Sequence, residues 1–364
     1  MNVTRAAAPH HPALAWEPDL LGAGYERLTL PLPDDDEGAV IATLIRALPP
    51  AGAPTPSFAF LAIHGWNDMF YQWALAEAVT AAGGAFYAID LRKYGRSWDP
   101  QRQSYGYTDS MRVYFADIDA ALAAMRTDLP ARFGPAAAQL PTILYGHSTG
   151  GLTATLYAGS RRGKDLAGLV LNSPWLDLQV GAAGSAVVVP VAELAARTAP
   201  KKPLPVHDPG FYGMVLDAWR PEGMTRVPGA PEGTSDPFWT TGWTPAWDMR
   251  PDPAPIRGGW LHAVIRAQRY VARNVRLRLP VLMLTAARSI VATAWSEELR
   301  GADTVLDVEQ MWARAAEIAS DVHILKLDHA EHDVLLSRAP VREAGFAEIR
   351  EFCQRQVRRA QRAR

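Results

Sequence analysis

The chain has 364 residues, with 37 lysines and arginines against 38 aspartates and glutamates, and its formal net charge is −1. This balance gives no basic excess of the kind that binds nucleic acid or an anionic membrane surface. The single cysteine, Cys353, excludes an intramolecular disulfide and a cysteine-based zinc site. No apolar run approaches the roughly 20 residues that span a membrane, and the first residues lack a signal-peptide core. We therefore expect a cytoplasmic protein with no integral membrane segment and no nucleic-acid partner.

The predicted elements begin with a strand hairpin, in which YERLTLPL and GAVIATLIRAL flank the acidic turn PDDDEG. The apolar strand SFAFLAIHG follows, a helix is expected over about 72–82, and GGAFYAIDLRKYGRS is a second buried strand that runs into a polar loop. The helix MRVYFADIDAALAAMRTDL leads to the strand TILY, and LAGLVLNSPWL is another apolar strand. Strands that are apolar throughout and separated by helices predict a mostly parallel sheet covered on both faces.

This alternation lapses between residues 177 and 275, where Pro, Gly and Trp are dense. A break this long inside a compact domain predicts an inserted cap, or lid, rather than one loop. The strand RLPVLMLTAA then resumes the sheet, followed by the helix VEQMWARAAEIA, the last strand VHILKL and a long charged helix. The expected organisation is an N-terminal extension over 1–24, a core over 25–176 and 276–364, and a cap over 177–275.

The segment TILYGHSTGGLTATLYA, residues 142–158, carries the pattern G-x-S-x-G between a strand and a helix. Gly146 and Gly150 remove side chains where the strand and the helix come closest, and Ser148 is left at the apex in a strained conformation. A glycine-rich turn with an incidental serine is the plainer interpretation. The strand before it and the helix after it favour a nucleophile elbow, and Ser148 is the predicted nucleophile.

A serine hydroxyl needs a base to remove its proton and a third group to orient that base. In an open parallel sheet these groups belong at the C-terminal ends of the strands. In LDHAEHDVLLS, after the last strand, His332 lies in a loop that can reach the elbow. We favour it over His329, which abuts the strand and is given a structural role. A metal site on these two histidines lacks a third ligand at a suitable spacing.

The acid is expected in the loop RSIVATAWSEELRGADTVLDVEQ, whose carboxylates are Glu297, Glu298, Asp303 and Asp307. Asp307 with Gln310 three residues later fits a capping pair at the start of a helix, and the two glutamates fit a solvated helical turn. Asp303, between small and apolar residues, suits a buried loop carboxylate. It is the preferred acid, with Asp307 as the alternative.

An oxyanion hole needs two backbone N–H groups aimed at the developing negative charge. Thr149, directly after the nucleophile, supplies one at a helix N-terminus, and the loop after FLAIHG should supply the other, most simply from Trp66. Asp90 in DLRKYGRS is interpreted as a structural carboxylate that fixes its loop by hydrogen bonds. His207–Asp208 are interpreted as surface residues of the cap.

Five segments, IHGWND, AIDLRKYGRS, YGHSTGG, GADTVLDV and HAEHDVLLS, occur in the order shown by α/β-hydrolase-fold serine hydrolases. Over residues of about 25–175 and 277–355 the chain most resembles the monoacylglycerol lipase and lysophospholipase-like branch, also grouped with the S33 serine aminopeptidases. The resemblance implies a mostly parallel eight-stranded sheet with helices on both faces and an inserted cap. It also implies two-step acyl transfer from small carboxylic esters, with Ser148 as nucleophile, His332 as base and Asp303 as acid, and with no metal or organic cofactor. The chain departs from the family pattern in an extension of roughly ten residues before Asp303.

The predicted cap carries several tryptophans, Trp239, Trp243, Trp247 and Trp260. They either line an apolar channel that accepts the acyl group or form the core of the cap itself. The predicted substrate contacts are His147, Trp239 and Trp243, the expected partner is a small acyl ester, and the expected state is a monomer or homodimer. Acyl transfer, thioester hydrolysis and amide or N-terminal-residue cleavage are alternatives on the same machinery. A protein that keeps the fold and only binds a ligand is an alternative of another class.

Overall fold

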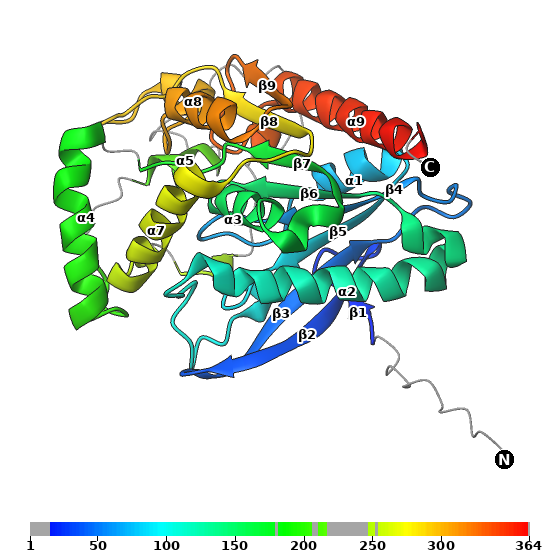
Figure 1. Cartoon of the computed structure of the whole chain (residues 1–364), viewed down its shortest axis with the longest axis horizontal. Coiled ribbons are helices and arrows are strands. Elements are labelled where there is room, and N and C mark those ends of the chain that lie inside the picture. Colours follow the sequence, from blue (N-terminus) through cyan, green and yellow to red (C-terminus); the bar gives the residue numbers. More distant parts are fainter. Residues whose placement is uncertain (1–14, 179–180, 206–209, 217–246, 252–253, 363–364) are drawn as a thin grey trace, which may run out of the picture.

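The computed structural model describes residues 15–178, 181–205, 210–216, 247–251 and 254–362. Across these residues runs a nine-stranded sheet in the order β1-β2-β3-β5-β4-β6-β7-β8-β9 (Figure 1). The strands are β1 (Glu17–Pro18), β2 (Tyr25–Asp35), β3 (Gly38–Ala47), β4 (Phe58–Ile63), β5 (Gly84–Asp90), β6 (Thr142–His147), β7 (Leu166–Asn172), β8 (Val281–Ala286) and β9 (Val322–Leu327).

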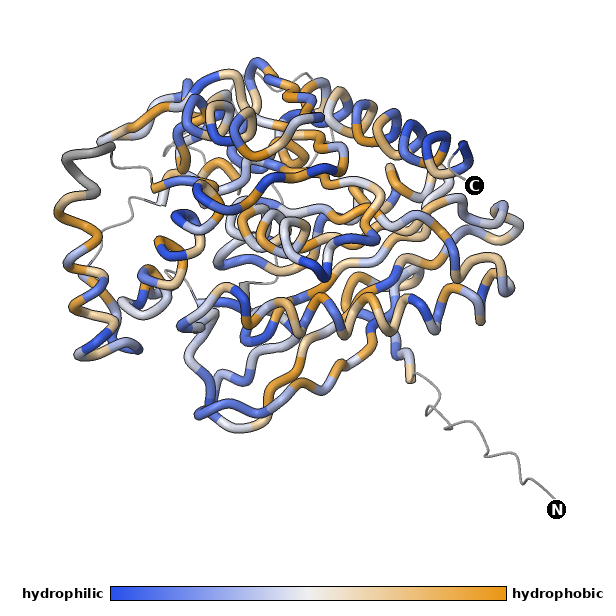
Figure 2. The backbone as a smooth tube through the Cα atoms, viewed as in Figure 1, coloured by the Kyte–Doolittle hydropathy of each residue, from blue (hydrophilic) through white to orange (hydrophobic). Residues whose placement is uncertain are grey.

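The central strands are apolar because both of their faces are covered. Every residue of β4, β5 and β8 is buried, and Figure 2 shows the hydrophobic residues concentrated in this part of the chain. The predicted hairpin is present as β2 and β3, which pair antiparallel, and β3 pairs antiparallel with β5. The pairs from β5 through β4, β6, β7 and β8 to β9 are all parallel. The predicted mostly parallel sheet is therefore confirmed.

The sheet has one strand more than the eight that were expected. Strand β1 lies in the segment assigned to an N-terminal extension, where Glu17 pairs with Arg27 and Pro18 with Glu26. The next residue, Asp19, accepts hydrogen bonds from the Nε and Nη2 atoms of Arg96 at 2.6 and 2.8 Å. The described part of this segment is thus held on the core by backbone pairing and a buried ion pair. A two-residue strand is too short to show a periodic hydropathy pattern in the sequence.

Helices cover both faces of the sheet, and the direction of each crossover decides which face a helix covers. The helices are α1 (Trp73–Ala81), α2 (Tyr114–Phe133), α3 (Thr149–Ala158), α4 (Gly181–Thr198), α5 (Phe211–Leu216), α7 (Gly258–Asn274), α8 (Val308–Ile318) and α9 (Ala339–Arg362). Parallel crossovers are right-handed. Helix α1 connects β4 to β5 in one direction along the sheet, whereas α3 connects β6 to β7 in the other direction. The two helices therefore lie on opposite faces, and α9 packs with α1 (Figure 1).

The reversal of strand order falls between the neighbours β4 and β6. In open parallel sheets the loops diverge at such a point and leave a crevice beyond the C-terminal ends of the strands. The loop after β4 begins at His64, and the turn after β6 begins at Ser148. The fold thus brings together the two segments in which the sequence predicts the oxyanion hole and the nucleophile.

The segment 177–275 contributes α4, α5, the short helix Trp247–Met249 and α7 to the described structure. Helix α4 packs along α7, which in turn contacts α3 and α8, so that α4 stands at the outer edge of the molecule in Figure 1. Among the helices that the structure describes, none combines the length and the apolar character that a membrane crossing requires.

Candidate active site

The turn after β6 has the geometry of a nucleophile elbow. Ser148 has φ 52° and ψ −115°, a conformation that non-glycine residues seldom adopt. A Cβ atom at Gly150 would collide with the carbonyl oxygen of His64, and one at Gly146 would collide with the carbonyl group of Gly150. Both glycines are therefore required by close approach of the backbone. The strain at Ser148 is of the kind that persists where the surrounding structure holds a reactive group in place.

A histidine and a carboxylate from two other loops meet beside this turn. The Nδ1 atom of His332, after β9, lies 2.9 Å from the Oδ2 atom of Asp303, after β8. Both residues are nearly inaccessible to solvent, with 2 % of His332 and 1 % of Asp303 exposed. The other carboxylate oxygen of Asp303 accepts hydrogen bonds from the backbone N–H groups of Val305 and Leu306, at 2.9 and 2.7 Å. The carboxylate is thus fixed on one side by its own loop and turned toward the histidine on the other.

The extension before Asp303 folds back onto the acid. Ser289 and Asp303 form an isolated parallel bridge, in which the Asp303 N–H donates to the carbonyl oxygen of Arg288 at 3.0 Å. The Ile290 N–H donates to the carbonyl oxygen of Asp303 at 2.9 Å. The additional residues therefore form a loop that returns to the sheet edge, and Asp303 keeps a position beside His332.

The other carboxylates that were candidates for the acid make structural contacts. Asp307 caps α8, where it accepts hydrogen bonds from the N–H groups of Glu309 and Gln310, and the Gln310 amide donates to it at 2.9 Å. This confirms the predicted capping pair. Glu297 and Glu298 lie in a short 3₁₀-helix and form ion pairs with arginines. Asp90 accepts hydrogen bonds from two backbone N–H groups and from the Arg96 guanidinium, as its predicted structural role requires.

The loop after β4 passes over the elbow. The Asp68 carboxylate accepts hydrogen bonds from the Gly65 N–H at 3.3 Å and the Met69 N–H at 2.8 Å, which closes this loop into a tight turn. The Trp66 ring packs on the Trp260 ring with centroids 5.2 Å apart. Thr149 is the first residue of α3, where a backbone N–H has no carbonyl acceptor within its own helix. The backbone of both predicted oxyanion residues thus belongs to segments that border Ser148.

A second buried polar cluster, which the sequence analysis did not identify, adjoins these residues. The Nδ1 atom of His147 faces two carboxylates, at 3.6 Å from Asp68 Oδ2 and 4.0 Å from Asp333 Oδ2. Its ring centroid is 5.0 Å from that of His332. In the sequence, these two carboxylates could have been found only by their position next to predicted site segments. Asp68 follows the motif IHGWN, and Asp333 follows His332 directly.

In this cluster, the charge of the imidazole and the charges of the carboxylates favour each other. Burial disfavours a charged imidazole, but the carboxylates of Asp333 and Asp68 outweigh this effect and raise the pKa of His147 above its ordinary value. Burial likewise disfavours a charged Asp68, yet His147, His64 and Arg250 together lower the pKa of its carboxyl below the ordinary value. Both directions favour an imidazolium at position 147 facing a carboxylate at position 68.

Glu331, on the other side of His332, has a different environment. Its side chain is buried, and neither carboxylate oxygen has a hydrogen-bond partner within the described part of the chain. Burial and the neighbouring Asp333 raise the pKa of Glu331 well above its ordinary value. The group is therefore held toward its neutral form, although Arg300, Arg338 and Arg342 act in the opposite direction.

The segment 177–275 reaches the base through α5. The Tyr212 ring meets the His332 ring edge-on, with centroids 5.3 Å apart. Trp260, on α7, is buried against Trp66 and Trp175 and has a core role. Several predicted cap residues lie outside the described residues, namely Trp239, Trp243 and His207–Asp208; the side chain of Trp247 is likewise not described.

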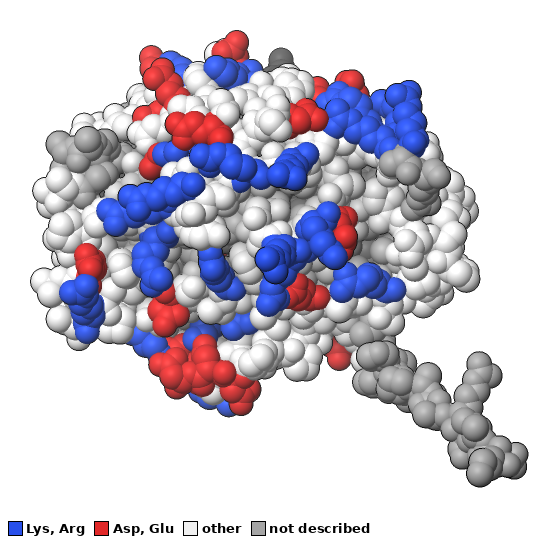
Figure 3. All heavy atoms as spheres, in the orientation of Figure 1, with Lys and Arg blue, Asp and Glu red and all other residues white. Residues whose placement is uncertain are grey.

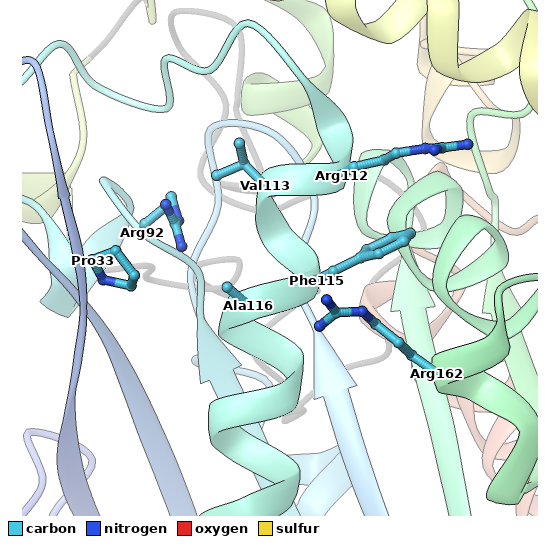
Figure 4. A pocket seen from close by; sticks show the side chains of 7 residues that line it. All are labelled: Pro33, Arg92, Arg112, Val113, Phe115, Ala116 and Arg162. Atoms are coloured by element: carbon cyan, nitrogen blue, oxygen red, sulfur yellow. The ribbon is translucent and has the colours of Figure 1, made fainter.

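A separate cavity of about 530 Å³ lies away from Ser148, at the start of α2. Its lining residues, labelled in Figure 4, are Pro33, Arg92, Arg112, Val113, Phe115, Ala116 and Arg162. Basic side chains also spread across the middle of the face seen in Figure 3. Within the cavity, however, Arg92 pairs with the buried Asp117, and Arg162 pairs with Asp119. These arginines have structural partners, and none of the lining residues belongs to the site around Ser148.

Comparisons with known proteins agree with this architecture. A family model described as serine aminopeptidase, S33, matches residues 54–339. Over 130 residues the chain is 29 % identical to phospholipase YtpA of Bacillus subtilis (strain 168), which corresponds to 35 % of this chain and 44 % of that protein. The chain thus spans less than half of the length of the curated relative that it matches.

Solved structures show the same fold at low sequence identity. A soluble variant of monoglyceride lipase from Saccharomyces cerevisiae, in complex with a substrate analogue, matches with a TM-score of 0.57 and 13 % identity over 97 % of this chain and 99 % of that chain. A highly thermostable carboxyl esterase from Bacillus coagulans, in complex with glycerol, matches with a TM-score of 0.57 and 15 % identity over 91 % of this chain and 99 % of that chain. The family match covers most of the chain and confirms the resemblance inferred from the motifs. The chain belongs to the S33 serine aminopeptidase family and has the α/β-hydrolase fold.

Proposed function

We propose that the protein is a serine hydrolase that cleaves small carboxylic esters, such as a monoacylglycerol or a lysophospholipid, through an acyl-enzyme. Ser148 is the nucleophile, His332 the general base and Asp303 the acid that orients it. The observation that carries this assignment is the 2.9 Å contact between His332 Nδ1 and Asp303 Oδ2, made beside a strained serine by loops from three separate strands. Chain order and loop placement agree with the triad of this fold.

The geometry supports a two-step reaction. Asp303 accepts a hydrogen bond from Nδ1–H of His332 and thereby leaves the Nε2 lone pair free to take the Ser148 proton. The serine oxygen attacks the ester carbonyl, and the N–H groups of Trp66 and Thr149 stabilise the oxyanion. The protonated His332 then gives its proton to the departing alcohol, which leaves the acyl group on Ser148. Water, deprotonated by His332, attacks this acyl-enzyme, and His332 returns the proton to the Ser148 oxygen as the acid leaves.

The substrate class rests on the cover of the site and on similarity. Tyr212 from α5 closes over His332, and the two tryptophan rings of Trp66 and Trp260 pack beside the oxyanion loop. Apolar cover from segment 177–275, which we assign as a cap, favours a medium acyl chain or a small aromatic ester over a polymer. The names of the similar proteins, a phospholipase, a monoglyceride lipase and a carboxyl esterase, point to the same class.

The test is hydrolysis of p-nitrophenyl esters of graded chain length by the wild type, Ser148→Ala and Ser57→Ala. Ser57 precedes β4 at the opposite end of the strand from the site, so that its replacement is a matched control. We expect Ser148→Ala to lose the enzymatic rate and Ser57→Ala to keep it. An unchanged rate in Ser148→Ala would refute the assignment. Thioester and aminoacyl anilide substrates, together with an added alcohol acceptor, distinguish ester hydrolysis from thioesterase, aminopeptidase and acyl-transfer activity. A protein that binds esters and turns none over would be a ligand-binding member of the fold.

A further inference from the structure

His147 occupies a position where three loops of the site meet. It ends β6 and directly precedes Ser148, and its ring faces Asp68 from the loop after β4 and Asp333 from the loop after β9. A Cβ atom built on Gly65 would lie 3.0 Å from Nδ1 of His147 and 3.3 Å from the Cβ atom of Ser148. The ring therefore packs directly under the oxyanion loop. It is 4 % exposed, which leaves it little access to a substrate.

Both carboxylates that face His147 are anchored by their own loops. Asp68 accepts the Gly65 and Met69 N–H groups, as described above. The Oδ1 atom of Asp333 accepts hydrogen bonds from the Asn172 side chain at 2.6 Å and the Leu335 N–H at 3.1 Å. Its Oδ2 atom, buried and without a hydrogen-bond partner among the described residues, is the atom that faces His147. In Asp333 one oxygen is anchored and the other faces the imidazole, whereas the Oδ2 atom of Asp68 both accepts the Gly65 N–H and faces the imidazole.

We propose that His147 is a positioning residue, which as an imidazolium joins the loops that carry the nucleophile, the oxyanion N–H group and the base. This inference rests on the proposed function. Through Asp68 the charge holds the Gly65–Trp66 turn over Ser148. Through Asp333, which directly follows His332, it holds the loop that carries the base. With a neutral side chain at position 147, the two buried carboxylates would lose the cation that faces both of them. Their mutual repulsion would then move the two loops apart.

The charged groups around His147 set the expected pH dependence. They are Asp68 from the loop after β4, Asp333 and His332 from the loop after β9, and Asp303 from the loop after β8. Arg250, 3.9 Å from Asp68, adds a positive charge on the far side of that carboxylate. The ring of His332, the proposed base, lies 5.0 Å from the ring of His147. Activity then requires a neutral His332 and a charged His147, which predicts a bell-shaped profile of kcat against pH.

The experiment compares the wild type with His147→Gln, with Asp333→Asn and with the control His323→Gln. His323 is a half-exposed histidine that pairs with Glu348 outside the site. We expect His147→Gln to lower kcat by about 10²-fold with little change in KM, since a displaced site costs this much without loss of ground-state binding. Its profile of kcat against pH should lose the alkaline limb. Asp333→Asn should move the alkaline limb to lower pH, and His323→Gln should change neither limb.

A second measurement follows the histidine side chains of the full chain by NMR, with Ser148→Ala as background. The signal that disappears in His147→Gln should titrate above 6.5, the ordinary value for histidine, and should move to lower pH in Asp333→Asn. Titration at or below 6.5 would overturn the proposal, and so would a His147→Gln variant with the wild-type kcat and alkaline limb. If His147→Gln does not fold, replacing the other histidines one at a time assigns the His147 signal by elimination, and its titration with and without Asp333→Asn still decides. A wild type without ester hydrolysis whose His147 titrates above 6.5 would overturn the proposed function and support the imidazolium bridge.

Discussion

Replacement of Asp303 by asparagine should remove catalysis while the site stays assembled. The hydrogen bonds of the Asp303 side chain explain this expectation. Oδ1 of Asp303 accepts two backbone N–H groups, from Val305 and Leu306. An asparagine must keep its oxygen in that position, because its NH₂ group cannot accept them. The NH₂ group is then turned toward Nδ1 of His332, which now has to accept a hydrogen bond. The imidazole proton moves to Nε2, and that nitrogen can no longer take the Ser148 proton.

The expected loss in kcat is about 10³–10⁴-fold, the effect of a wrong histidine tautomer in a serine triad, or about 4–5.5 kcal/mol in the barrier. The free energy of unfolding should change far less, because the backbone hydrogen bonds to the side-chain oxygen are kept. Initial rates on a short-chain p-nitrophenyl ester give kcat and KM, and urea denaturation gives stability.

Asp307→Asn is the matched control for this substitution. Asparagine is as good an N-cap as aspartate, and Asp307 caps α8 outside the His332 contact, so its variant should keep both activity and stability. A folded Asp303→Asn variant that retains more than a tenth of the wild-type kcat would refute the tautomer argument. Loss of activity in Asp307→Asn with activity retained in Asp303→Asn would reassign the acid.

Three further predictions concern groups around the site. Glu331→Gln should stabilise the protein, relative to the wild type, increasingly as pH rises from about 4.5. The pKa of Glu331 is higher in the folded than in the unfolded protein, so the wild type loses stability as pH rises from the unfolded pKa toward the folded pKa. Urea denaturation of both proteins at pH 5 and pH 8 measures the difference. Gly150→Ala should prevent folding or abolish activity because its Cβ atom collides with main-chain atoms after β4, whereas Gly213→Ala, with no atom within 4 Å, should cost nothing and gain up to about 1 kcal/mol; circular dichroism melts compare the two. Asp90→Ala should lower the free energy of unfolding by about 3–5 kcal/mol, since Arg96 loses one of its two buried carboxylates and two buried N–H groups lose their acceptor; equal denaturation midpoints would contradict this.

The strained turn at Ser148 and the place of His332 at the sheet edge could be predicted from sequence because their signals are local. The pattern around Ser148 requires glycine at two fixed offsets, and the structure shows a backbone collision at each of them. His332 follows the last strand of the sheet, and strand order alone sets the edge at which it lies. Asp303 was distinguished from Asp307 because a capping pair has its own recognisable spacing, which removed one candidate from the loop.

The cluster around His147 left no such signal. Asp68 and Asp333 are 265 residues apart along the chain by their numbers, and each is an ordinary acidic residue in its own segment. They meet His147 only because the strand order places the ends of β4 and β6 side by side and the loop after β9 returns to the same edge. Strand β1 was missed for a related reason, since a two-residue strand is defined by its partner rather than by its own hydropathy.

The charges of the site show why one more cation is needed beside a serine triad of this kind. Asp68, Asp303 and Asp333 bring three carboxylates to one buried region, and Arg250 lies 3.9 Å from Asp68. The imidazolium proposed at His147 would place its charge 3.6 Å from Asp68 and 4.0 Å from Asp333. One positive charge would then face two of the three carboxylates, so that a single side chain links the loop after β4 with the loop after β9.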